Sequence, residues 1–306
     1  MNDKFSDTIK CPVLLNIFQE MRPRQWTKNI IVLAAFFFAL GDKEQNVSLI
    51  LFWAALLAAI LFSVTASAIY VFNDIYDIRK DRFHPVKKKR PVAAGLISIP
   101  FAWGIIIGCL LLGLPGAWFL SANFGIVLTA YVALQIVYSL ALKHIAILDV
   151  FIIAIGFVLR AVAGAFVVQV TISPWLLICT FLLALFLALC KRRHEKWLMA
   201  EKHVENFRHS LISSNIQLLD QLVAIVAGAV IVTYAIYTQW PDTIEKFGTS
   251  YLSLTIPFVI FGLFRYLDLV YRHRKGDQPE AILLADIPLL IDVALFGFSV
   301  FLITSL

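Results

Sequence analysis

Charged side chains are scarce in this chain. Asp, Glu, Lys and Arg make up 15% of its 306 residues, whereas apolar residues make up 60%. A soluble domain carries about 25% charged residues, and about half of its residues are apolar. An apolar excess of this size is too large for one buried core. The composition therefore excludes an ordinary soluble protein and predicts a membrane protein with several spans.

Cysteine is also rare, and its spacing excludes two classes of small domain. The chain has four cysteines and no CxxC pair, so neither a zinc module nor a disulfide framework is expected. Cys109, Cys179 and Cys190 lie in or beside apolar segments, where cysteine acts as a packing residue. The first twenty residues carry acids and lack the pattern of a cleavable signal, so we expect no removed leader.

Long apolar segments are abundant. A membrane-spanning helix needs about 20 apolar residues. Because backbone groups in lipid must bond within their own segment, such segments are helices. The sequence predicts an all-α polytopic membrane protein, a nine-helix bundle forming a single integral membrane domain over residues 1–306. The nine segments lie at about 24–40, 49–72, 101–119, 123–142, 148–170, 174–190, 217–238, 251–270 and 286–305.

The basic residues are distributed unequally between the two ends of these segments. With the N-terminus placed in the cytoplasm, 23 of the 26 Lys and Arg fall on the cytoplasmic side. Lys43 and Lys246 fall on the other side, and Arg160 lies inside a span. This bias predicts a multi-pass protein of the inner or plasma membrane with a cytoplasmic N-terminus and cytoplasmic loops at about 73–100 and 191–216. The net charge of +6 then reflects topology and anionic lipid, so no nucleic-acid partner is expected.

The densest polar segment is YVFNDIYDIRKDRFHPVKKKRP, at the cytoplasmic edge of the second span. Asn73, Asp74, Asp77 and Asp81 recur at spacings of three and four, which places them on one face of a helix. Like charges at this spacing repel, so a cation is expected among them. Oxygen ligands suit Mg²⁺, which proteins usually bind with one or two carboxylates plus substrate phosphates. The pattern predicts a magnesium–diphosphate site.

A simpler interpretation of this segment is a solvated helix end. Its acids would then pair with the neighbouring bases Arg79, Lys80 and Arg82, and such pairs are common in charge runs. The shared face and the position at a membrane boundary favour the metal site. The basic run at Lys87–Arg90 fits phosphate binding and topological charge equally well. Arg90 is its best candidate for a site residue.

A second set of polar residues follows the fourth span. Lys143 lies in a tight turn, Asp149 opens the next helix, and Gly156 and Arg160 follow on the same stripe of that helix. Arg160 lies about 16 Å along the helix from Asp149. An arginine at such depth marks a functional site by default. We expect Lys143 and Arg160 to hold an anionic substrate, and Asp149 is a candidate for a second cation. A structural ion pair of Arg160 with an acid is the alternative.

Two further basic clusters have ambiguous roles. RPRQWTKN, at residues 22–29, contains Arg24 and Lys28, and KRRHE, at residues 191–195, contains Lys191 and Arg192. Both clusters are typical of interfacial anchors, since Trp and bases gather at membrane boundaries. The positive charge of KRRHE also complements the C-terminal dipole of its helix. Phosphate binding is the functional alternative for each cluster.

Together these motifs resemble the UbiA superfamily of intramembrane prenyltransferases. NDIYDIRKDRFHP resembles its NDxxDxxxDxxxP motif, and YSLALKHIAILD resembles its second motif. The resemblance covers essentially the whole chain and implies the nine-helix UbiA bundle with its active site at the cytoplasmic face. RPRQWTKN, KRRHE and the FRYLDLVYR segment are similar to one branch in particular, which transfers 5-phosphoribose from phosphoribosyl pyrophosphate (PRPP) to a polyprenyl phosphate for lipid-linked arabinose synthesis.

The resemblance implies a Mg²⁺-dependent site and assigns its residues. The catalytic candidates are Asp77, Asp81, Lys143 and Asp149. The metal ligands would be Asn73, Asp74, Asp77 and Asp81. The residues expected to bind substrate are Arg24, Lys28, Arg90, Tyr138, Lys143, Arg160, Lys191 and Arg192. The implied partners are PRPP, a polyprenyl phosphate and the membrane, and the sequence leaves a homo-oligomer open.

The second motif departs from that of the aromatic prenyltransferases, which carry a pair of acids spaced as DxxxD. Here Asp149 is followed by Ile153 at the fourth position, which suits a site for one diphosphate. Another UbiA-type enzyme, moving a prenyl group from a prenyl diphosphate to an aromatic or other acceptor, remains an alternative. A transporter is disfavoured, because its ligands usually lie near the membrane midplane between inverted repeats.

Overall fold

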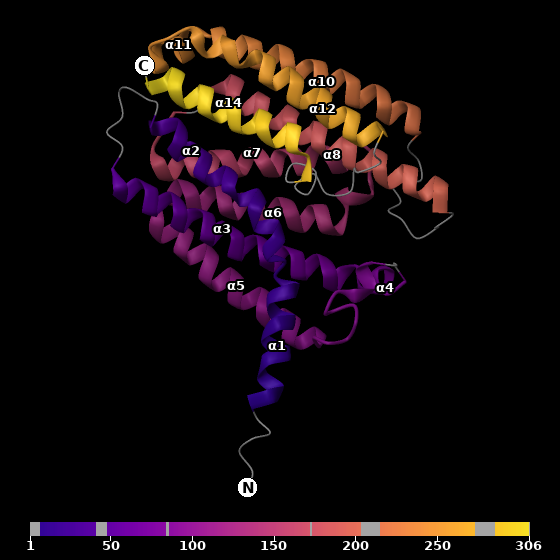
Figure 1. Ribbon diagram of the computed structural model, residues 1–306. Helices are drawn as coiled ribbons and strands as arrows, with labels where there is room; N and C mark the ends of the chain where they lie inside the picture. Colours follow the sequence, from indigo (N-terminus) through magenta and orange to yellow (C-terminus); the bar gives the residue numbers. More distant parts are fainter. Residues whose placement is uncertain are drawn as a thin grey trace. The chain divides into compact units, whose positions relative to one another are not determined.

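The computed structural model describes residues 7–40, 48–83, 86–171, 173–202, 215–272 and 285–305. Within these ranges the chain forms α-helices and short 3₁₀ segments and contains no β-strand. Figure 1 shows the helices in chain order. The all-α fold class expected from the sequence is confirmed. Cys109 and Cys190 are buried and unpaired, as expected of packing residues.

Eight helices are long and apolar enough to cross a membrane. Each corresponds to one of the expected spans. The ends differ by a few residues, except that α8 continues to Lys202, well past the expected end at 190. The protein is a multi-pass membrane protein. The eight are α3 (Leu49–Tyr76), α5 (Ile99–Leu120), α6 (Ala122–Leu140), α7 (Leu148–Val168), α8 (Pro174–Lys202), α10 (Ile216–Gln239), α12 (Ile256–Arg272), whose span begins in η4 (Tyr251–Thr255), and α14 (Ile287–Ser305).

The first expected span, at 24–40, has a different form. Its polar half is the 3₁₀ segment η1 (Pro23–Asn29), and its apolar half is α2 (Ile30–Leu40). Trp26 and Asn29 donate hydrogen bonds to the hydroxyls of Ser67 and Ser63, which are one turn apart on α3. These side-chain bonds hold η1 against α3. The eleven residues of α2 extend about 16 Å, so the described residues do not establish nine full spans.

The chain forms two compact units, and the expected single domain over residues 1–306 stays a prediction. The first unit comprises Met1–Ala35, Leu49–Lys143 and Val162–Gln169. In it α3 packs against α5 and α6 (Figure 1), around a core that includes Ala68, Val71 and Ile106. Small residues allow close approach of its helices.

Gly164 shows how tight this packing is. A Cβ atom at Gly164 would lie 2.1 Å from the backbone oxygen of Val32, so α7 and α2 can meet there because residue 164 has no side chain. Short helices at the polar ends complete the first unit: α1 (Asp7–Glu20), α4 (Ile78–Asp81), η2 (Lys87–Lys89) and η3 (Leu142–His144).

The second unit comprises Phe36–Ser48, His144–Ala161 and Val170–Leu306. Here α8 packs against α10, α10 against α12, and α12 against α14. Its core includes Val150 on α7, Phe186 on α8 and Tyr266 on α12. The short helix α11 (Pro241–Phe247) packs beside α10. The loop expected at 191–216 begins inside α8, and residues 203–214 lie outside the described residues.

Candidate active site

The aspartate segment leaves the membrane helix through a bend at Asp77. α3 ends at Tyr76 and α4 begins at Ile78, with Asp77 between them at φ −92° and ψ 6°. The backbone still bonds across the bend, since the Asp77 N–H donates to the Asn73 carbonyl at 2.9 Å. The sequence predicted one uninterrupted helical face here. Asp77 instead occupies the sparsely populated bridge region, and its carboxylate meets a different partner from those of Asp74 and Asp81.

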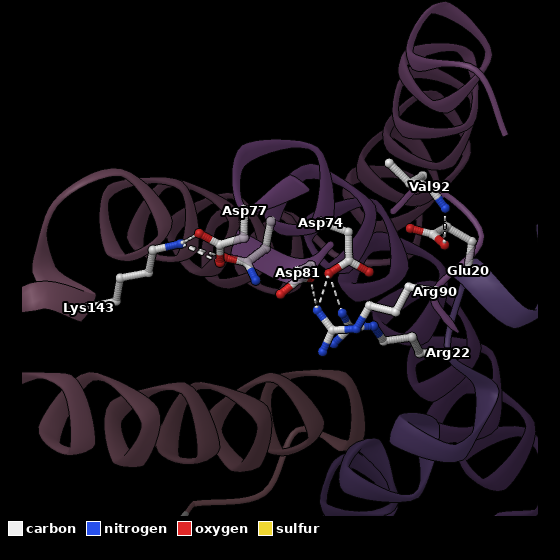
Figure 2. Close-up of polar contacts among 9 residues, drawn as sticks. Glu20, Arg22, Asp74, Asp77, Asp81, Arg90, Val92 and Lys143 are labelled. Atoms are coloured by element: carbon white, nitrogen blue, oxygen red, sulfur yellow. Dashed lines mark hydrogen bonds and ion pairs between the residues drawn. The ribbon is translucent and has the colours of Figure 1, made fainter. Parts of the chain in front are cut away.

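Arg90 joins Asp74 and Asp81. Its Nη1 atom donates to the Oδ1 of Asp74 at 2.8 Å and to the Oδ2 of Asp81 at 2.5 Å. Both carboxylates are buried, whereas the side chain of Arg90 is 26% exposed. Arg22 also donates to the Oδ1 of Asp74. Two guanidinium groups therefore neutralise this pair of acids in the structure (Figure 2). Desolvation raises the pKa of Asp81, and the charges of Arg90 and Lys87 act against this effect.

Lys143 neutralises the other acid of the motif. Its Nζ atom lies 2.8 and 2.7 Å from the two oxygens of Asp77 and 3.1 Å from the Oδ1 of Asn73. The ammonium group also lies 4.8 Å from the centre of the Tyr76 ring. Lys143 is 2% exposed, so its charge is stabilised mainly by these contacts. Lys143 thus lies with the aspartate motif in the first unit, whereas the sequence argument had grouped it with Arg160.

Arg22 enters the site although the sequence argument favoured its neighbour Arg24. Arg22 has the left-handed conformation, with φ 54° and ψ 59°, at the junction between α1 and η1. Non-glycine residues rarely take this conformation, which clusters at functional sites. At this junction Arg22 donates to Asp74, and its guanidinium lies 5.5 Å from the ring centre of Tyr70. Arg24 is exposed. The RPR pattern predicts basic residues at this membrane boundary, but it does not predict which of the two arginines contacts the aspartate motif.

Glu20 is a second residue that sequence reasoning missed. It ends α1, is 1% exposed, and accepts a hydrogen bond from the backbone N–H of Val92 at 3.3 Å. Burial raises the pKa of Glu20 to about 7, and the nearby charge of Asp74 acts in the same direction. An isolated acid before a basic cluster resembles an ordinary helix-end residue. No sequence signal identifies its burial against residues 74 and 92.

Mg²⁺ fits the oxygen chemistry of this site. The Oδ2 atom of Asp74 is buried and has no hydrogen-bond partner among the described residues, so one carboxylate oxygen stands unclaimed. In the described part of the chain, no three His, Cys, Asp or Glu side chains converge closely enough to form a complete metal cage. Arg90 instead bridges Asp74 and Asp81, and Lys143 occupies both oxygens of Asp77. Proteins usually bind Mg²⁺ through one or two carboxylates plus substrate phosphates, and that incomplete set is what the motif offers.

Asp149 lies in the second unit and forms an ion pair. Its Oδ2 accepts from the Nε of Arg192 at 2.8 Å, and both side chains are buried. The Nη1 of Arg192 bonds Glu195 at 2.5 Å. The two residues expected to act as a second cation site and as a phosphate ligand therefore bind each other. A buried pair of this kind costs several kcal/mol if one partner is removed, typically ~3–5.

Arg160 lies inside α7 and is 4% exposed. Its Nη1 donates to the Gly156 carbonyl one turn earlier, at 2.7 Å, and its guanidinium lies 5.2 Å from the Phe157 ring centre. Part of the hydrogen-bonding capacity of this guanidinium is thus met by its own helix.

The remaining predicted substrate residues fall in both units. Lys28 is half-buried and Tyr138 buried in the first unit, and Lys191 is half-buried in the second.

Comparison with known proteins identifies the family. The UbiA prenyltransferase family model matches residues 29–287. The chain belongs to this family. Among solved structures, a UbiA homolog from Archaeoglobus fulgidus bound to GPP and Mg²⁺ is similar, with a TM-score of 0.70 at 19% identity. The match covers 95% of this chain and all of that one, so the UbiA fold extends over nearly the whole protein.

Curated UbiA relatives are similar over most of the sequence. The decaprenyl-phosphate phosphoribosyltransferase of Mycobacterium tuberculosis is 32% identical over 275 residues, covering 90% of this chain and 89% of the relative. The enzyme of the same name from Mycolicibacterium smegmatis is 34% identical over 277 residues, covering 88% of this chain and 86% of the relative. The resemblance inferred from the motifs is confirmed.

The ion pairs of the first unit predict how ligands stabilise it. Mg²⁺ alone must compete with Arg90 and Lys143 for the carboxylates, whereas Mg²⁺ with inorganic diphosphate also offers those bases new anionic partners. We expect Mg²⁺ with diphosphate to raise the melting temperature of the purified protein by a few degrees, and either component alone to raise it less. Differential scanning fluorimetry in detergent measures this.

Matched variants show whether the effect arises at this site. Asp81→Asn should remove most of the ligand-dependent shift. Asp268→Asn, at an acid that is ion-paired with Arg265 and Arg272 in α12, should keep it. Equal shifts in both variants, or a full shift with Mg²⁺ alone, would contradict the assignment.

Proposed function

We propose that this UbiA protein transfers 5-phosphoribose from PRPP to a polyprenyl phosphate and releases diphosphate. The product would be a polyprenyl-phosphate-linked phosphoribose, a precursor of lipid-linked arabinose. The names of its relatives support this assignment. The observation that carries it is the cluster of three aspartates and three bases in the first unit, around the C-terminal end of α3. Such a cluster suits a substrate that combines several phosphates with a divalent ion.

The aspartate motif would hold the diphosphate end of PRPP. Asp74 and Asp77, with Asn73 and Asp81, would supply oxygen ligands for Mg²⁺ on the leaving group. The chemistry that Mg²⁺ supplies when bound is neutralisation and orientation of the diphosphate. Arg22, Arg90 and Lys143 then exchange carboxylate oxygens for phosphate oxygens. Arginine can grip a phosphate through two parallel hydrogen bonds, whereas lysine acts as a point charge.

The reaction exchanges one C–O bond for another at the anomeric carbon. The bond to diphosphate breaks, and an oxygen of the lipid phosphate forms the new bond from the opposite face. A phosphate at neutral pH is already anionic, so the attack needs little help from a general base. Catalysis therefore rests on positioning and on stabilisation of the leaving charge. Lys28 of the first unit is a candidate for holding the lipid phosphate. In the second unit, Asp149 would act by orienting Arg192, and the substrate-binding role expected for Arg160 stays a prediction.

Prenyl transfer to another acceptor is the second candidate. The structural neighbour that binds GPP and Mg²⁺ favours it, because the same motif can hold a prenyl diphosphate. The second motif speaks against it, since Ile153 stands where the aromatic prenyltransferases carry the second acid of DxxxD. Consumption of PRPP and of a prenyl diphosphate, measured side by side, separates the two activities.

Asp77→Asn tests the proposed reaction. The variant loses a negative charge beside the buried Lys143 but keeps an oxygen for its ammonium group, so we expect a lower melting temperature without loss of the fold. We expect turnover of radiolabelled PRPP with polyprenyl phosphate to fall by at least about 100-fold. Excess EDTA should have the same effect on the wild type. Asp242→Asn, at an exposed acid in α11, is the matched control and should keep full activity. Wild-type turnover by Asp77→Asn would refute the role of this carboxylate.

The charge distribution supports an active site on the cytoplasmic face of the cell membrane. PRPP carries several negative charges and does not cross lipid. Sealed inside-out vesicles should therefore consume PRPP added outside, whereas right-side-out vesicles should do so only after permeabilisation. Activity confined to right-side-out vesicles would reverse the proposed orientation.

A further inference from the structure

The buried acid Glu20 touches two parts of the candidate site that are far apart in the sequence. Its Oε2 atom accepts the N–H of Val92, two residues after Arg90. Arg22, which binds Asp74, follows Glu20 by two residues. Glu20 is thus close along the backbone to Arg22 and is hydrogen-bonded to the backbone beside Arg90, the two arginines that bind Asp74 (Figure 2).

The other oxygen of Glu20 faces the aspartate motif. Figure 2 shows the carboxyl groups of Glu20 and Asp74 turned toward each other, and each residue is 1% exposed. The Oε1 of Glu20 and the Oδ2 of Asp74 are both buried, and neither has a partner among the residues that the structure describes. Buried oxygen atoms without hydrogen bonds cost free energy in a protein interior. Their retention next to the metal motif points to a role in the site.

Arg90 needs such an anchor because of its local structure. It follows the 3₁₀ segment η2 and precedes the turns that lead to α5, so no long helix fixes it. Val92 is 1% exposed and belongs to the same core as Val71 on α3. The hydrogen bond from Val92 to Glu20 therefore joins the Arg90 segment to the end of α1 inside a packed region.

We propose that Glu20 is a positioning residue of the diphosphate site, which holds the backbone after Arg90 and the carboxyl of Asp74 in fixed register. This inference rests on the proposed function for the identity of the ligand. Glu20 acts through Asp74 and Arg90 and touches neither metal nor substrate. Its length matters, because the side chain must reach both Val92 and Asp74. Its charge does not, because a neutral amide can accept from Val92 and donate to Asp74.

Two substitutions test separately whether the length or the negative charge of the Glu20 side chain matters. Glu20→Gln keeps the length and both contacts but removes the charge. Glu20→Asp keeps the charge but is one methylene shorter. We expect Glu20→Asp to raise the KM for PRPP on the order of 10–100-fold, the usual cost of removing an orienting contact, with the KM for polyprenyl phosphate unchanged. Glu20→Gln should restore the KM for PRPP to within about threefold of wild type. Glu245→Asp, the same shortening at an exposed acid in α11, is the control.

The result that would overturn the proposal is the reverse order, in which Glu20→Gln fails and Glu20→Asp works, because the negative charge would then be required. Equal KM values for PRPP in both variants and the wild type, whatever their melting temperatures, would also overturn it.

A readout without turnover separates this inference from the proposed reaction. The stabilisation by Mg²⁺ and diphosphate should shrink in Glu20→Asp and persist in Glu20→Gln. If the wild type consumes no PRPP but this pattern holds, the proposed reaction fails and the positioning role stands. If the wild type consumes PRPP and the pattern is absent, the positioning role fails alone.

Discussion

The mutual neutralisation of acids and bases beyond α3 is the interaction on which this site depends. Asp74 and Asp81 are buried, and Asp77 faces a lysine that is itself buried. Each charge would be costly to bury alone, so the cluster is stable only as a set. The same arrangement prepares the site for an ionic ligand. A magnesium–diphosphate unit brings both signs of charge, so it can replace the internal partners without leaving a buried charge unpaired.

The fold and the core of the site were predictable from the sequence because their signals are local. Apolar runs of about 20 residues define the spans, and eight of them recur as helices. The spacing of Asp74 and Asp81 placed them on one face, and Arg90 does bind both. The free-energy cost of placing an arginine inside a membrane span marked Arg160 as a candidate site residue. The position of Lys143 in a tight turn marked it as another. These inferences needed only periodicity and the cost of charge in lipid.

The rest depended on geometry that residue patterns do not carry. Asp77 pairs with Lys143, whereas Asp74 and Asp81 pair with Arg90, and the shared helical spacing did not specify this division. Of the two neighbouring arginines, Arg22 contacts Asp74, and it does so from a left-handed conformation. Apart from glycine, residue type does not predict that conformation. Glu20 is buried by a contact with Val92, 72 positions away. The pairing of Asp149 with Arg192 likewise joins α7 to α8. Each of these outcomes was decided by tertiary contacts.

The central claim is that the carboxylates of residues 74, 77 and 81 receive a divalent ion together with a diphosphate. Electron paramagnetic resonance with Mn²⁺ in place of Mg²⁺ tests it most directly. The account predicts ³¹P hyperfine coupling to protein-bound Mn²⁺ when diphosphate is present, and loss of that signal in Asp77→Asn. An unchanged signal in the variant, or tight Mn²⁺ binding that shows no coupling to phosphorus, would contradict it.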